Sequence, residues 1–76
     1  MRPFVGQVVI YRQPDEARPH NGTPEHPALV TRVHSDVCVN LTVFYDAGPF
    51  TAITSVMRAG TSNPGGESWD FRQAEV

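Results

Sequence analysis

Apolar residues, many of them β-branched or aromatic, gather in five short runs along the 76-residue chain. Within the runs they recur at every second position or continue over several positions, a pattern that is typical of strands. Gly, Pro, Asn and Asp separate the runs and supply turn signals. No segment has a helical period. The pattern therefore predicts five strands, at residues 5–12, 27–34, 37–45, 50–57 and 69–71.

The run at 37–45 alternates most regularly and predicts which side of the sheet holds the core. One face is continuously apolar and consists of Val37, Val39, Leu41, Val43 and Tyr45. The other face is half polar and consists of Cys38, Asn40, Thr42 and Phe44. We expect the apolar face to pack against Val8, Ile10, Val56 and Trp69. The half-polar face is then free to meet a partner.

Five short strands with turns between them are typical of a small antiparallel barrel or a partly open sandwich. We therefore predict an all-β fold with five antiparallel strands, in one domain that spans residues 1–76. A chain of this length buries only about 60% of its unfolded surface, so its stability is marginal. Self-association is the simplest way to bury more surface, and we expect a homo-oligomer.

Composition and charge exclude several classes of partner. The formal net charge is −2, and all six basic residues are arginines. This balance gives no general attraction for nucleic acid, which needs a basic surface. Cys38 is the only cysteine, so there is no intrachain disulfide and we expect a packing role in a reducing cytoplasm. The first six residues lack the apolar segment of a signal peptide, and no run is long enough to span a membrane.

Candidate chemistry is sparse. The three histidines, His20, His26 and His34, do not have the spacing of a zinc or facial-triad site. We expect His20 and His26 in an exposed loop and His34 at a strand end. No serine lies in a nucleophile-elbow pattern, and no two carboxylates share an element where burial could separate their pKa values. The sequence therefore predicts no metal, no cofactor and no enzymatic activity.

Three arginines lie within or just after predicted strands, and arginine suits planar, bidentate recognition of phosphate and carboxylate groups. They are either scattered on the solvated surface or converge on an anionic, planar ligand such as a nucleotide. In the second case the contacts would include an aromatic residue for stacking, Phe44 or Tyr45. A 76-residue barrel has little spare volume, so such a site would lie between subunits. The candidate ligand-binding residues are Tyr11, Arg12, Arg32, Asn40, Phe44 and Arg58.

The front half of the chain, with "VGQVVIYRQPD" and "GTPEHPALVTRV", resembles the opening of the MazF-type toxins. That family begins with a GD-V strand and enters its next strand as RPALV. The resemblance implies an SH3-like barrel, commonly a dimer, and cleavage of RNA. His26 stands where the family carries its catalytic arginine.

A second resemblance spans most of the chain. The motifs "GQVVIYR", "HPALVTRV", "VNLTVFYDAG", "TSV" and "GGESWDF" are similar, in order and spacing, to small uncharacterised proteins of phages and prophages. This resemblance implies a phage accessory protein, to which no reaction is attached.

Together these observations favour a non-enzymatic binding protein of phage or prophage origin. Such a protein could counter host defence in the host cytoplasm by blocking a host protein or by sequestering a nucleotide signal. One alternative is a degenerate MazF-like ribonuclease that uses His26 and Arg32 as acid, base or phosphate clamp. Another is a virion component that docks through its sheet edge or through the face from Cys38 to Phe44.

Overall fold

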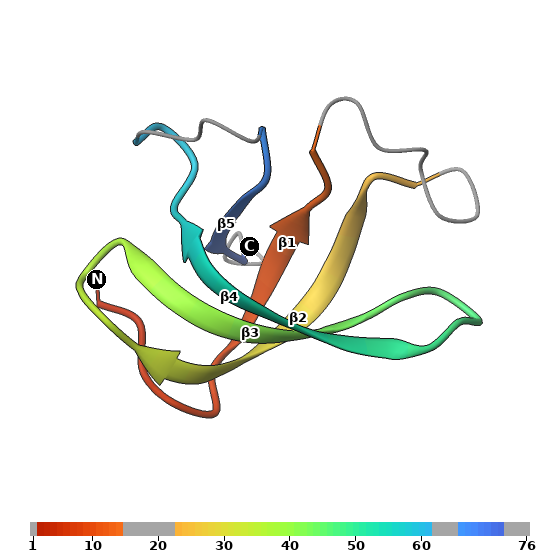
Figure 1. The fold of residues 1–76 in the computed structure, drawn as a ribbon, viewed down its shortest axis with the longest axis horizontal. Helices are drawn as coiled ribbons and strands as arrows, with labels where there is room; N and C mark the ends of the chain where they lie inside the picture. The colour runs from red at the N-terminus through yellow and green to blue at the C-terminus, as the bar shows by residue number, and fades with distance from the viewer. Residues whose placement is uncertain (1, 15–22, 62–65, 73–76) are drawn as a thin grey trace.

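The computed structural model describes residues 2–14, 23–61 and 66–72, and the strands in these ranges form one antiparallel sheet (Figure 1). The strand order across the sheet is β4-β3-β2-β1-β5. The sheet curls into a half-barrel, consistent with a small SH3-like barrel, so the predicted fold class is confirmed. The described residues include no helix that could span a membrane. The strands are β1 (Val8–Arg12), β2 (Glu25–Val33), β3 (Cys38–Phe44), β4 (Phe50–Met57) and β5 (Ser68–Phe71).

The two outermost strands, β4 and β5, approach each other at one end of the sheet. Arg58, directly after β4, forms a parallel bridge with Trp69 of β5. The N–H of Ala59 donates to the carbonyl of Trp69 at 2.9 Å. At the opposite end, the β3–β4 hairpin projects away from β5 (Figure 1). The sheet is therefore closed at one end only.

The core lies on the concave side of the sheet. Trp69 is fully buried there, and its indole N–H donates to the carbonyl of Val37 at 3.0 Å. Phe71 packs edge-on against Trp69, with 5.1 Å between the ring centroids. The apolar face of β3 points inward as predicted, because only that face is continuously apolar. The buried hydrophobic residues are Val9, Tyr11, Ala28, Val30, Val39, Leu41, Val43, Val56 and Trp69.

The prediction for β1 was wrong about its inner face. Val9 and Tyr11 are buried, whereas Val8 is 42% exposed and Ile10 is only partly buried. Both faces of this strand are apolar, so alternation alone does not decide between them. The pairing of Val9 with Ala28 and Phe71 places Val9 on the core side.

Two β-bulges interrupt the ladders around Asn40. Where β2 pairs with β3, the register shifts between Val30 and Arg32. Where β4 pairs with β3, the register shifts between Ile53, which faces Leu41, and Val56, which faces Val39. Each bulge adds one residue to its strand and increases the local bend. As a result Ile53 and Val56 both contact the core although they are three positions apart, so the strict alternation of 50–57 does not hold.

Candidate functional site

The convex side of the sheet carries a second set of apolar side chains, which we call the outer face. The strand register places them in rows. The first row consists of Val8, Leu29, Thr42 and Ala52. In the next row Ile10 pairs with Pro27 and with Asp70, and Phe44 pairs with Phe50. The outer face therefore crosses the sheet from β1 to β4, and we define it by Val8, Ile10, Pro27, Leu29, Phe44 and Phe50.

Several of these side chains are exposed to an unusual degree for their size. Val8 is 42%, Phe44 43% and Phe50 72% exposed. Phe44 and Phe50 lie side by side, with 6.3 Å between ring centroids. Single exposed apolar residues are common on protein surfaces, but a group of them on one face of a sheet is a typical feature of an interaction surface. The sheet is thus apolar on both sides.

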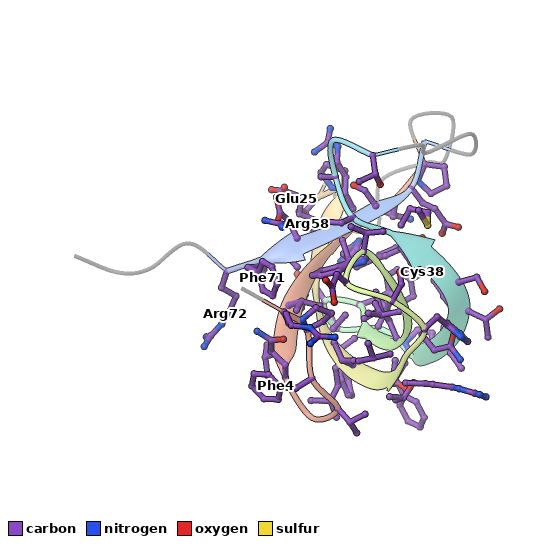
Figure 2. All side chains as sticks on the ribbon, turned by 90° about the vertical axis from the view of Figure 1, so that its left-hand side faces the viewer. Phe4, Glu25, Cys38, Arg58, Phe71 and Arg72 are labelled. Atoms are coloured by element: carbon purple, nitrogen blue, oxygen red, sulfur yellow. The ribbon has the colours of Figure 1, made fainter. Side chains whose placement is uncertain are left out.

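A groove of about 510 Å³ lies at the β1–β5 end of the outer face. Its lining includes the apolar residues Ile10 and Pro27 and three charged residues, Arg12, Glu25 and Asp70. Arg12 and Glu25 approach each other to 3.9 Å, and both side chains are about half exposed. Figure 2 shows Glu25, Arg58 and Phe71 near this end of the barrel and Phe4 at the other end.

Among the predicted ligand-binding residues, the two arginines Arg12 and Arg58 come near this groove. Arg12 lines it directly. Arg58 donates from Nε to Asp70 at 2.9 Å, and its guanidinium lies 4.6 Å from the centroid of the Phe71 ring. Arg58 is therefore held by a carboxylate and an aromatic ring at the groove margin.

Tyr11 lies on the other side of the sheet, in the core. Its hydroxyl donates to the Glu67 carboxylate at 2.9 Å. Burial raises the pKa of Tyr11 above its usual value, and the hydrogen bond to Glu67 raises it further. The phenol thus stays neutral and remains bound to a residue of the same chain.

The remaining predicted ligand-binding residues lie elsewhere on the sheet. Arg32 is exposed and pairs in register with Asn40 beside the bulges. The side-chain oxygen of Asn40 accepts from the backbone N–H of Ser55 at 2.9 Å and lies 2.8 Å from Nε2 of His34. Phe44 is at the far end of β3. The structure therefore places the six predicted residues in several separate regions.

The histidines occupy different environments from those expected. His26 lies within β2, is only 1% exposed and so is not a loop residue. Its Nε2 is 3.0 Å from Oε1 of Gln13, and its ring packs edge-on against Tyr45 at 4.7 Å. β2 begins before Pro27 because Glu25 and His26 pair with β1. His34 is exposed, and His20 lies outside the described residues.

No cluster of three His, Cys, Asp or Glu side chains that could hold a metal ion is present in ranges 2–14, 23–61 and 66–72. Cys38 is partly buried at the start of β3.

The sequence reasoning predicted the β3 portion of the outer face, from Cys38 to Phe44, as a surface for a partner, but it missed the extension of this face over β1, β2 and β4. The sequence feature that could have revealed the rest of this face is the continuous apolar run of β1, because such a run indicates a strand with two apolar faces. No protein-family model, curated protein or solved structure matches the chain. The outer face and its groove are therefore the candidate functional site.

Proposed function

We propose that this protein is a non-enzymatic binding module of phage or prophage origin that acts by docking a host protein on its outer face. The observation that carries the proposal is the second apolar surface, with Val8, Phe44 and Phe50 exposed on a sheet that already has a complete core on its other side. A protein partner would remove this surface from water, which is favourable. The proposed site of action is the host cytoplasm, where blocking a defence protein would be the consequence.

The groove adds specificity to this apolar surface. Two pairs of opposite charge lie in the groove or at its margin, Arg12 with Glu25 and Arg58 with Asp70. Each of these arginines already faces a carboxylate, so the pairs offer no unbalanced positive charge to a phosphate group. The arrangement therefore supports a partner that presents apolar residues flanked by polar groups able to hydrogen-bond with these pairs.

The same charges are unfavourable for a nucleotide. Arg58, one of the arginines predicted to bind phosphate, already contacts Asp70 and Phe71. Tyr11, predicted to contact such a nucleotide, donates to Glu67 in the core. These contacts favour the protein-blocking form of the hypothesis over the nucleotide-sequestering form.

The ribonuclease alternative receives no comparable support. His26 is buried on the core side of β2, and Arg32 is exposed six positions further along the same strand. At about 3.3 Å per residue, the two are roughly 20 Å apart along the strand. One phosphodiester group is too small to contact both side chains.

The test compares two matched double variants with the wild-type chain. Val8→Ser/Phe44→Ser changes the outer face, and Phe4→Ser/Val5→Ser makes the same chemical changes at exposed positions before β1. Each purified protein is immobilised and exposed to a bacterial lysate, and captured proteins are identified by mass spectrometry. A photoreactive p-benzoylphenylalanine at position 44 then tests direct contact.

We expect the wild type and the Phe4/Val5 variant to capture the same host protein from the lysate. The Val8/Phe44 variant should not capture it. The same host protein should crosslink to the photoreactive residue at position 44. Equal capture by all three proteins, or no specific capture, would overturn the proposal. Native mass spectrometry of the purified protein provides the opposing test. A nucleotide-sized mass excess that disappears on denaturation would replace the proposed partner with a nucleotide, and recovery of the protein in purified particles would favour a virion component.

A further inference from the structure

We propose that β4 pairs antiparallel with β4 of a second copy of the chain, around a two-fold axis at Ala52. The proposal concerns the edge of the sheet and is independent of the partner proposed for the outer face. It rests on the backbone groups that β4 leaves open, on the residues that flank them and on the symmetry of the segment.

One side of the first half of β4 is open. β4 is an outermost strand, and its register pairs it with β3 alone. The bridge from Arg58 to Trp69 lies after the strand, beyond the bulge at Ser55. In the part of the chain that the structure describes, residues 50–54 therefore have a strand on one side only. This segment lies on the hairpin that projects from the barrel (Figure 1).

The hairpin register shows which backbone groups face the open side. The N–H of Tyr45 donates to the carbonyl of Pro49 at 3.3 Å, next to the Phe44–Phe50 pair. Hydrogen-bonded and non-hydrogen-bonded pairs alternate along an antiparallel ladder. Thr51 and Ile53 therefore direct their N–H and C=O groups toward β3. Phe50, Ala52 and Thr54 direct theirs outward.

These outward groups are self-complementary. When two copies of β4 run antiparallel with Ala52 opposite Ala52, Phe50 of each copy lies opposite Thr54 of the other. Every outward N–H of this segment then meets an outward C=O, as in a regular hydrogen-bonded ladder. The small Ala52 side chains leave room where the two strands meet at the axis.

Nothing in the segment opposes such pairing. Exposed edge strands commonly carry a charge, a proline or a bulge that prevents contact with another edge. The residues from Phe50 to Met57 include no charged residue and no proline, and the regular pairing with β3 continues as far as Ile53 before the bulge. The exposed side chains of Phe50 and Ala52 are uncharged, so two copies do not repel each other here.

A second copy is the occupant that this symmetry favours. A foreign strand would need a matching register by chance, whereas an identical β4 supplies it through the two-fold axis. Sheet extension across the axis also buries surface that a 76-residue chain leaves exposed. The expected assembly is a dimer with one continuous sheet across both copies.

The test uses the full chain and introduces a positive or a negative charge at Ala52, the residue on the proposed two-fold axis. Ala52→Lys and Ala52→Glu each place like charges opposite each other, and Ala59→Lys is the matched control in the turn after β4. Sedimentation velocity and native mass spectrometry report the assembly of each protein and of an equimolar mixture of the two Ala52 variants. Circular dichroism checks that all of them are folded.

We expect dimers for the wild type and Ala59→Lys, and self-association weakened about tenfold or more for each Ala52 variant alone. The mixture should form a Lys–Glu heterodimer, because residue 52 faces its own counterpart. A monomeric wild type, a dimer that persists in both Ala52 variants, or a mixture without heterodimer would overturn the proposal. Failure of the lysate experiment would leave these results unchanged, so the two proposals are tested separately.

Amide exchange supplies a second readout. The N–H groups of Phe50 and Ala52 face solvent in a single copy and should become protected as the protein concentration rises. Those of Thr51 and Ile53 are bonded to β3 and should be protected at all concentrations. A dimer whose Ala52 amide still exchanges freely would show that the copies meet at another surface.

Discussion

Substituting Trp69 with phenylalanine should destabilise the barrel without unfolding it. The side chain is fully buried and makes two distinct contributions. Its indole N–H bonds to the carbonyl of Val37, and its ring fills the core beside Phe71. Phenylalanine retains an aromatic ring but loses the hydrogen bond and part of the volume. The substitution therefore separates local destabilisation from loss of the core.

The two losses can be estimated separately. The carbonyl of Val37 also accepts from the N–H of Arg58 at 2.8 Å, so it keeps one partner and the lost bond costs about 1 kcal/mol. The smaller ring leaves a void and loses apolar contacts, which costs about 1–2 kcal/mol. The sum is about 2–3 kcal/mol. A domain of this size has a free energy of unfolding of about 4–11 kcal/mol, so the variant should remain folded.

The assay is urea and thermal unfolding followed by far-ultraviolet circular dichroism at one fixed protein concentration, because self-association makes the Tm concentration-dependent. At about 4–8 °C per kcal/mol, the Tm should fall by about 8–24 °C. Phe4→Leu is the control, because Phe4 is 60% exposed and precedes β1, so the change should alter the free energy of unfolding by less than about 0.5 kcal/mol. A Trp69→Phe variant within about 0.5 kcal/mol of the wild type would refute the reasoning.

Three further changes test individual contacts. Tyr11→Phe removes the hydrogen bond to Glu67 and should cost about 1 kcal/mol at neutral pH. Burial raises the pKa of Tyr11 in the folded protein above its unfolded value of about 10. The Tyr11 hydroxyl therefore contributes fully to the free energy of unfolding below pH 10, and this contribution is lost as the pH rises further. Above pH 10 the free energy of unfolding should consequently fall less steeply in Tyr11→Phe than in the wild type during alkaline denaturation. Asn40→Ala frees the N–H of Ser55, and that amide should exchange faster by nuclear magnetic resonance, with a loss of about 1 kcal/mol. Ser55→Gly should raise the free energy of unfolding by about 0.5–1 kcal/mol, because Ser55 has a φ of 54°.

Each of these predictions has an outcome that contradicts it. An unchanged alkaline unfolding profile in Tyr11→Phe would mean that this phenol does not set the pH dependence. Wild-type exchange at the Ser55 amide would mean that Asn40 does not hold the bulge. A loss of stability in Ser55→Gly would mean that the entropy lost by glycine exceeds the relief of the unfavourable φ.

The sequence predicted the number of strands and the orientation of β3 because each depends on local pattern. It misassigned β1 because Val8, Val9, Ile10 and Tyr11 are all apolar, and the inner face is selected by pairing with strands far away in the chain. The bulge in β4 was not visible because it depends on the register with β3. Alternation along one strand contains no information on such contacts.

The candidate site was harder to predict for the same reason. Arg12 and Arg58 lie more than forty positions apart, yet the approach of β5 to both strand ends brings them near one groove. Arg32 lies in β2 beside a bulge, where the strand departs from regular pairing. Predicted strand ends were correct to within a few residues, but convergence of side chains depends on how the sheet curls.

The pairing of β1 with β5 also determines the order in which the protein can fold. Val9 is near one end of the chain and contacts Phe71 near the other. Contacts between such distant positions form slowly because a long loop must close first. During synthesis, β1 to β4 can form a meander as soon as they are made, but the core around Val9 and Tyr11 is incomplete until Trp69 has been added. Completion of the barrel is therefore a late event, and the incomplete sheet is the species most in need of protection from aggregation.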